Sequence, residues 1–150
     1  MKKIIVFITL IILLITLVVF FLLNNKKVEE KESVVFFFDL VEKDTDISFL
    51  NTQSSILHWK VVDENNDVIT VEKSSKNAEI KNITESESEK INNFFEENGF
   101  ELDIYNLADS PQGSVKGYRK NKMYCIITQD YKLSDRDAIT SIDMNINCAI

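Results

Sequence analysis

The 150-residue sequence is poor in residues that break secondary structure or bind metals, with three Gly, one Pro, one His and two Cys. So little Gly and Pro, together with 45% hydrophobic residues, is not the composition of a disordered tail. A single histidine, His58, cannot build a multi-histidine metal site. The sequence also contains no G-x-S-x-G, H-E-x-x-H or glycine-rich phosphate-binding motif. No catalytic residue, cofactor site or metal site can therefore be named from the sequence.

Acidic residues outnumber basic residues, 24 to 17, and the imbalance is uneven along the chain. Residues 1–27 hold four Lys and no acid, so residues 28–150 carry a net charge of −11. A domain with this charge repels phosphate backbones, so no nucleic-acid partner is expected. The simplest interpretation of the acidic excess is solubility.

One long hydrophobic run is present, because Ile4–Leu23 contains no charge, no Pro and no Gly. A helix of this length, at about 1.5 Å per residue, spans roughly the 30 Å hydrocarbon core of a bilayer. The alternative is a cleaved signal peptide, but the run is longer than a signal core and no small-residue cleavage site follows it. The sequence therefore predicts a cytoplasmic N-terminus at 1–3, a transmembrane helix at 4–23 whose partner is the lipid bilayer, and a charged stalk at 24–33.

The remaining residues, 34–150, have the length of one domain. The clearest helix is predicted at Glu85–Asn98, between a Thr84–Glu87 capping box and a stop at Gly99. We therefore expect an α+β fold, in which a single helix packs on a mostly antiparallel β-sheet.

The strands are recognised from short apolar runs and from alternating apolar and polar residues. They are predicted at Val34–Val41, Ile47–Leu50, Ile56–Val62, Val68–Lys73, Ala78–Lys81, 100–105, Val115–Arg119, Lys122–Thr128 and 141–150. Polar loops are predicted at Asn51–Ser55, Asp63–Asp67, Asn106–Gly113 and Gln129–Asp137. For the first strand one alternative stays open, in which Phe36–Phe38 lie at the bilayer interface.

The two cysteines, Cys125 and Cys148, each fall on the apolar face of a predicted strand. If the two strands are antiparallel neighbours with these residues opposed, Ile127 meets Ile146, and all apolar side chains share one face. The sequence thus predicts a disulfide with Cα atoms about 4.4–6.8 Å apart. The alternative is two buried free thiols in a cytosolic domain.

A disulfide also bears on the orientation of the chain. Lysines lie on both sides of Ile4–Leu23, so the count of positive residues barely distinguishes the two orientations. Disulfides persist in oxidising compartments, which places residues 34–150 outside the cytoplasm. The expected location is the cell membrane, with a single span.

Three further patterns have simple structural interpretations. His58 is expected on the outer face of a strand, as ordinary surface. Asp63–Asp67 has the D-x-N-x-D spacing of a calcium loop, but Val68 and Ser74 replace its Gly and its closing Glu, which favours a plain hairpin turn. Asn82–Thr84 matches a glycosylation sequon, which matters only in a cell that has the machinery.

Two resemblances concern the plan of the chain. The order of Thr84–Ile150, a helix followed by three or four strands, resembles the helix-on-sheet plan of PepSY or cystatin-like modules, without shared motif residues. A membrane helix leading to a β-domain with a C-terminal disulfide also resembles type IV pilins. Pilins carry a processing signal of Gly, Phe and Glu, and this chain has Lys3, Ile4 and Ile8 in those places.

These observations predict a single-pass, membrane-anchored protein whose extracytoplasmic domain is a non-catalytic binding or assembly module, with a protein partner in the envelope. The alternative function is an envelope hydrolase that uses paired carboxylates, because 24 acidic residues allow many pairs that only folding can bring together.

Overall fold

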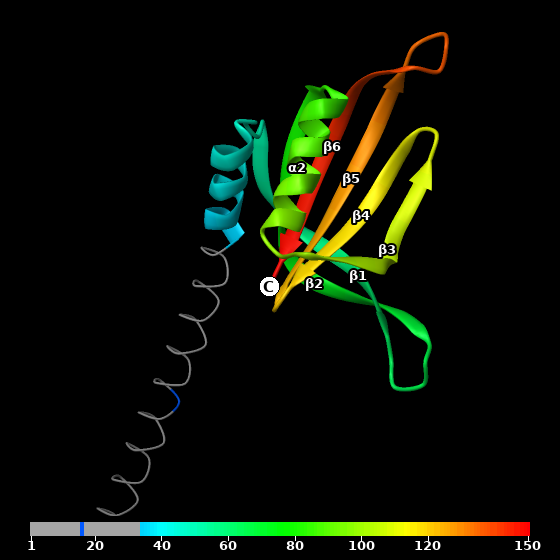
Figure 1. Cartoon of the computed structure of the whole chain (residues 1–150). Coiled ribbons are helices and arrows are strands. Elements are labelled where there is room, and N and C mark those ends of the chain that lie inside the picture. The colour runs from blue at the N-terminus through cyan, green and yellow to red at the C-terminus, as the bar shows by residue number, and fades with distance from the viewer. Residues whose placement is uncertain (1–15, 17–33) are drawn as a thin grey trace, which may run out of the picture. The chain divides into compact units, whose positions relative to one another are not determined.

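Six antiparallel strands form one curved sheet, and two helices complete the domain (Figure 1). The computed structural model describes Thr16 and residues 34–150, so the predicted membrane span and stalk lie outside the described residues, apart from Thr16. Within the described part of the chain, no helix combines the length and the apolar character needed to cross a membrane. The residues Val34–Ile150 form one structural unit.

The first helix covers residues 34–45, and strands and a second helix follow. In chain order these are β1 (Asn51–Val62), β2 (Val68–Ile83), α2 (Glu85–Glu97), β3 (Glu101–Ser110), β4 (Gly113–Lys120), β5 (Met123–Leu133) and β6 (Ile139–Ala149). The strand order in the sheet is β1-β2-β6-β5-β4-β3, and every neighbouring pair is antiparallel. The predicted α+β fold with an antiparallel sheet is confirmed, but the domain has two helices where one was predicted.

The additional helix replaces the strand predicted at Val34–Val41, and that prediction is wrong. Val34, Phe37, Phe38 and Val41 are buried, which is the i, i+3, i+4, i+7 spacing of one helix face. Three of the four residues between them, Val35, Phe36 and Leu40, are also apolar and hide this period, with Phe36 70% exposed. A short, continuous apolar run does not distinguish a strand from a buried helix.

The following strands are longer than predicted, which corrects three assignments. The strand predicted at Ile47–Leu50 is a connecting segment, and the loop predicted at Asn51–Ser55 is the start of β1. Ala78–Lys81 was predicted as a short edge strand, but it belongs to β2 and pairs with β6 in the interior of the sheet. Polar residues form strand here because pairing with β2 satisfies backbone groups of Asn51–Ser55, and β2 itself lies between β1 and β6.

The helix α2 is bounded as the sequence predicts. Thr84 and Glu87 form the complete capping box, and the hydrogen bonds from Thr84 hold the pKa of the Glu87 carboxyl below its usual 4.5. At the other end Gly99 has a φ of 73°, and the Phe100 N–H donates to the Phe95 carbonyl over 3.0 Å. This is the Schellman stop, and the rings of Phe95 and Phe100 lie 5.0 Å apart.

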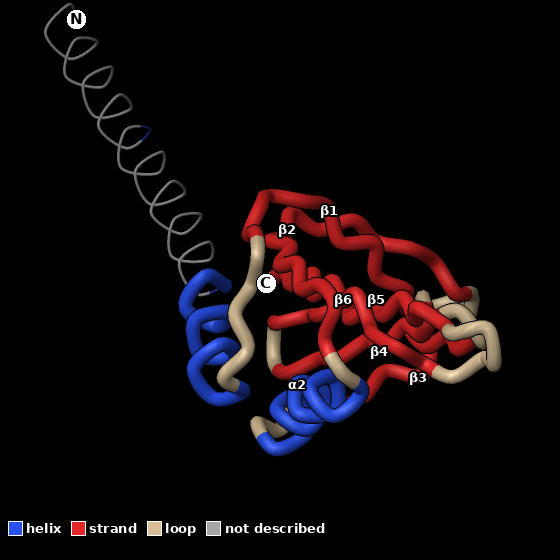
Figure 2. Tube along the Cα trace, turned by 90° about the horizontal axis from the view of Figure 1, so that it is seen from above, coloured by secondary structure: helices blue, strands red, loops and turns tan. Residues whose placement is uncertain are grey.

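Aromatic packing joins the two helices to the sheet. The ring of Phe37, on helix 34–45, lies 5.9 Å from Phe94 and 5.5 Å from Phe95 of α2. Phe95 in turn stacks on Tyr118 of β4 at 4.9 Å. These rings belong to one buried cluster with the apolar side chains of β6. Figure 2 shows α2 lying against one side of the curved sheet.

The sheet curves far enough that its two edge strands meet. The register of β3 against β4 shifts between Asp103 and Leu107, which makes a bulge in β3. The loop predicted at Asn106–Gly113 is mostly strand, because β3 continues to Ser110 and only Pro111 and Gln112 form the turn. In this bulge the side chain of Asn106 accepts from the Lys60 N–H at 2.9 Å and donates to the Lys60 carbonyl at 3.0 Å. One amide side chain therefore takes the place of a paired strand at this point of β1.

The close approach of β4 to Asn106 and Trp59 requires the glycine at position 117. A Cβ at Gly117 would lie 2.4 Å from the Asn106 Cβ and 3.1 Å from the indole of Trp59. Only glycine lets β4 approach both side chains, so Trp59 is buried although it lies on the opposite face of the sheet from α2.

We expect Asn106→Ala to lower the free energy of unfolding by about 1–3 kcal/mol, because it leaves the partly buried N–H and carbonyl of Lys60 without partners. The matched control is Asn77→Ala, which removes a single side-chain hydrogen bond of 3.3 Å to Asn145 and should change stability by less than about 0.5 kcal/mol. Urea unfolding of both variants measures the difference. Equal losses would mean that the amide does not close the sheet.

Candidate functional site

The sheet has two faces of different character. On the helix face, Ile142, Met144, Ile146 and Cys148 of β6 are buried in the main core. The alternate residues of β6 point to the opposite face. That face is apolar around Trp59, whose ring packs edge-on against Tyr124 at 5.2 Å. It is polar farther along β2 and β6.

The predicted disulfide is present between Cys125 of β5 and Cys148 of β6. The two residues are directly opposed, with Cα atoms 4.1 Å apart, slightly closer than expected. The predicted partners Ile127 and Ile146 are also opposed. Both cysteines are fully buried, so the bond links the two strands from within the core and is closed to solvent thiols.

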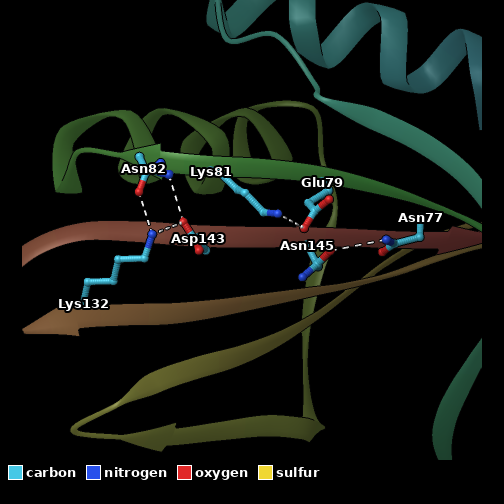
Figure 3. Close-up of polar contacts among 7 residues, drawn as sticks. All are labelled: Asn77, Glu79, Lys81, Asn82, Lys132, Asp143 and Asn145. Atoms are coloured by element: carbon cyan, nitrogen blue, oxygen red, sulfur yellow. Dashed lines mark hydrogen bonds and ion pairs between the residues drawn. The ribbon is translucent and has the colours of Figure 1, made fainter.

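The polar part of the opposite face is an ordered network (Figure 3). The Asp143 carboxylate accepts from the backbone N–H of Asn82 at 2.9 Å and from the Lys132 ammonium at 2.9 Å. These two hydrogen bonds hold the pKa of Asp143 below its usual 3.8. Asn82 has a φ of 55°, which asparagine tolerates, at the register shift between β2 and β6. The Asp143 carboxylate therefore stabilises the register shift between β2 and β6.

The same network contains two further contacts, and both join neighbouring side chains. Lys81 lies 3.1 Å from Glu79 along β2, and Asn77 donates to Asn145 across the β2–β6 pair at 3.3 Å. Figure 3 shows these side chains in a row over the ribbons of β2 and β6. Charges and amides that already satisfy one another stabilise the sheet and leave little capacity for a reacting group.

A second polar network lies between α2 and the helix face. Gln129 of β5 donates to the Ser88 hydroxyl at 2.9 Å and accepts from the Ser114 hydroxyl at 2.9 Å. The Tyr131 hydroxyl donates to Ser114 at 3.1 Å. These groups are hydroxyls and an amide without a base beside them, so the network positions α2.

Elsewhere in the core, burial and the charge of Glu96 raise the pKa of Tyr118 to about 12, which keeps its phenol protonated.

The remaining sequence patterns prove to be structural. His58 is exposed and lies directly across from Glu72, with 3.5 Å between its Nδ1 and the carboxylate. A surface pair of this kind contributes little. Asp63 accepts from the N–H groups of Asn65 and Asp67 at 2.9 Å each, so the predicted hairpin turn is confirmed. In the sequon, the Thr84 hydroxyl is occupied by the helix cap.

Two carboxylates line one shallow cavity of about 220 Å³ at the β3–β4 turn, Asp109 and Asp130. Asp109 pairs with Ser114, and Ser114 pairs with Gln129, so these three residues share a face. Asp130 follows Gln129 and points to the opposite face. The register therefore separates the two carboxylates. Among the residues that the structure describes, no group of three His, Cys, Asp or Glu could hold a metal ion.

A larger and more apolar cavity, of about 350 Å³, opens at the end of the domain where helix 34–45 begins and β6 ends. We call it the Phe37 pocket. It is lined by Phe37, Leu40, Asn98, Phe100, Lys120, Asn121, Lys122, Met123 and Ile150. This volume lies within the range of small-molecule sites, and a mostly apolar lining with a few polar groups is typical of them.

Two lysines give the Phe37 pocket its charge. The Lys120 ammonium donates to the Asn98 carbonyl at 2.6 Å and lies 5.7 Å from the ring of Phe100. Lys122 has no ion-pair partner among residues 34–150. The pocket is thus an apolar cavity with a cationic margin.

This pocket was not predicted from the sequence, because its wall includes the helix that was interpreted as a strand. One signal could have indicated it. Between Pro111 and Gln129 the acidic chain holds four basic residues and no acid. Three of them, Arg119, Lys120 and Lys122, lie at the β4–β5 turn. A basic turn on an acidic domain is a local charge asymmetry that can be recognised in the sequence.

No protein-family model matches the chain, and comparison with curated proteins and with solved structures gives no significant match.

We expect Cys148→Ser to lower the free energy of unfolding by about 2–5 kcal/mol, since the disulfide closes a loop between positions 23 residues apart. Cys125→Ser should have a similar effect, and the double variant should be no less stable than either single variant. Chemical unfolding of the three variants tests this. Additive losses would show that the cysteines act as independent core residues.

Asp143 should make the stability of the domain depend on pH. Its pKa is lower in the folded chain, so its contribution is present above the usual pKa and is lost as the pH falls through the folded value. Between about pH 5 and pH 3, Asp143→Asn should therefore lose less stability than the unmodified chain. Asp135→Asn, in the loop before β6, makes the same charge change and is the control. Thermal unfolding across this pH range measures both slopes, and parallel slopes for all three proteins would contradict the assignment.

Proposed function

We propose that the chain is a single-pass, membrane-anchored protein whose domain at 34–150 lies outside the cytoplasm and works as a non-catalytic binding or assembly module. The observation that carries this proposal is a set of exposed apolar side chains on the edge strand β3. We call it the β3 patch, and it consists of Leu102, Ile104, Tyr105 and Leu107. Ile104 is 73% exposed. Adjacent exposed apolar residues on a soluble surface mark interaction sites.

The bulge of β3 supports this interpretation. Asp103 is buried and accepts from the Tyr105 N–H at 2.9 Å, while Asn106 is held by Lys60. Both polar side chains of the bulge turn inward, and the apolar ones are left in water. Exposing apolar side chains to water while polar ones are buried costs free energy, and a binding partner that covers the apolar side chains would offset this cost. A strand edge also offers unpaired backbone groups to a partner.

The compartment is inferred from the buried Cys125–Cys148 disulfide, because such bonds are kept in oxidising environments. The anchor is inferred from the sequence of Ile4–Leu23. The alternative, a hydrolase with paired carboxylates, has less support. Such enzymes hold two carboxyl groups about 5–10 Å apart on either side of the bond they cleave. Asp130 and Asp143 lie directly opposite each other on β5 and β6, but Asp143 is engaged by Asn82 and Lys132. The register directs Asp109 and Asp130 to opposite faces.

The proposal is tested by cross-linking on intact cells with an amine-reactive reagent that does not cross membranes. Lys60 and Lys116 lie beside the β3 patch, Lys60 through Asn106 and Lys116 directly opposite Leu107. We expect a discrete cross-linked species that contains a second protein and disappears in Ile104→Glu. Ile56→Glu is the matched control, because Ile56 is also an exposed isoleucine, 55% accessible, on the other edge strand. This variant should keep the cross-link.

Three outcomes would contradict the proposal in different ways. Cross-linking only by a membrane-permeant reagent would place the domain in the cytoplasm. Loss of the species in both variants would show that the β3 patch has no special role. No species with either reagent, together with hydrolysis of an envelope polymer by the purified chain, would favour the hydrolase.

A further inference from the structure

The Phe37 pocket combines two surfaces that rarely occur together on an acidic domain. Its floor is formed by apolar side chains, among them Phe37, Leu40 and Met123. Its margin carries Lys120 and Lys122, and among the residues that the structure describes no Asp or Glu lines it. Glu101, which follows Phe100 in the chain, is already paired with Arg119 at 3.5 Å. A ligand that suits this site has an apolar part beside a negative charge.

An exposed aromatic residue extends the apolar surface beyond the pocket. Phe36 and Leu40 are one helical turn apart, so they lie on the same side of helix 34–45. Leu40 lines the pocket, which places the 70% exposed ring of Phe36 beside it, toward the start of the helix. Exposed Phe and Leu side chains on one side of an amphipathic helix are able to enter the interface between membrane and water.

The length of the chain before the helix limits how far this end of the domain can lie from a bilayer. Ten residues, 24–33, separate the apolar run Ile4–Leu23 from Val34. A fully extended segment of this length spans at most about 36 Å. Val34 itself begins the helix that lines the pocket. This argument rests on the proposed function, since it requires the chain to be anchored by Ile4–Leu23.

We infer that the Phe37 pocket docks an anionic phospholipid of the membrane in which the chain is anchored. The phosphate of the headgroup binds the ammonium groups of Lys120 and Lys122, and the beginning of an acyl chain lies between Phe37, Leu40 and Met123. Phe36 enters the interface beside it. Because the rest of the domain carries an excess of acid, this basic end is the part of the surface that an anionic leaflet attracts. Lipid docking thereby sets which way the β3 patch faces.

The test uses the full chain reconstituted in nanodiscs of phosphatidylcholine with a minority of phosphatidylglycerol. One probe lipid carries a photoreactive diazirine near the start of an acyl chain, and it has either a glycerol or a choline headgroup. After illumination, mass spectrometry locates the adducts. We expect the phosphatidylglycerol probe to label Phe37, Leu40 or Met123, and the phosphatidylcholine probe to label them several-fold less.

The double variant Lys120→Gln and Lys122→Gln should reduce labelling of the pocket by the phosphatidylglycerol probe by about tenfold, since each lysine near an anionic surface contributes to binding. The matched control is Lys76→Gln with Lys90→Gln, which removes a half-buried lysine from β2 and an exposed lysine from α2. It should leave the labelling unchanged. Thermal unfolding of both variants verifies that they are folded.

The possible failures are distinguishable. A chain that is not retained in the nanodiscs would overturn the proposed anchor and with it this inference. A retained chain without pocket adducts, or with equal labelling by both headgroups, would overturn the lipid site alone. Equal loss of pocket labelling in both double lysine variants would show that labelling depends on the net charge of the domain and not on Lys120 and Lys122. If a diazirine fatty acid labelled the pocket as strongly as the phosphatidylglycerol probe, the pocket would be assigned to free fatty acids.

Discussion

The register between β5 and β6 is the constraint on which the rest of the domain depends. It opposes Cys125 to Cys148 and Ile127 to Ile146, and so directs the alternating side chains Ile142, Met144, Ile146 and Cys148 of β6 to the face that α2 covers. A shift of one residue would move that set into water and bring Asp143, Asn145 and Asn147 into the core. The buried disulfide fixes this register covalently. The core, the polar network of Asp143 and the position of α2 all follow from it.

Curvature gives the domain its second organising feature. The amide of Asn106 satisfies both backbone groups of Lys60, which joins the edge strands β3 and β1 where no strand pairing is possible. The same bulge buries Asp103 and leaves Ile104 in solvent. A single local irregularity thus closes the sheet and creates the β3 patch. Bulges are commonly found where a strand re-aims side chains toward a functional surface.

The two proposed surfaces lie on different parts of the domain and have different chemistry. The β3 patch is apolar and lies on an edge strand, which suits a protein partner. The Phe37 pocket is apolar with Lys120 and Lys122 at its margin, which suits an anionic amphiphile. One surface would hold the domain against the membrane while the other stays available, as an assembly module requires.

The sequence by itself determined the elements whose signals are local. The ends of α2 follow from the Thr84–Glu87 capping box and from Gly99, and the pairing of Cys125 with Cys148 follows from period-two alternation on both strands. These features depend on residues close together in the chain or on one strongly patterned pair of strands. Only the tertiary structure decided that the apolar run 34–41 is helical, because packing against Phe94 and Phe95 selects among conformations that the run allows. Likewise, the hydrogen bond of Asn106 with Lys60 and the placement of Leu40 and Lys122 around one cavity bring together residues far apart in the sequence. Such contacts are stabilised by burial, which arises only once the whole chain has folded.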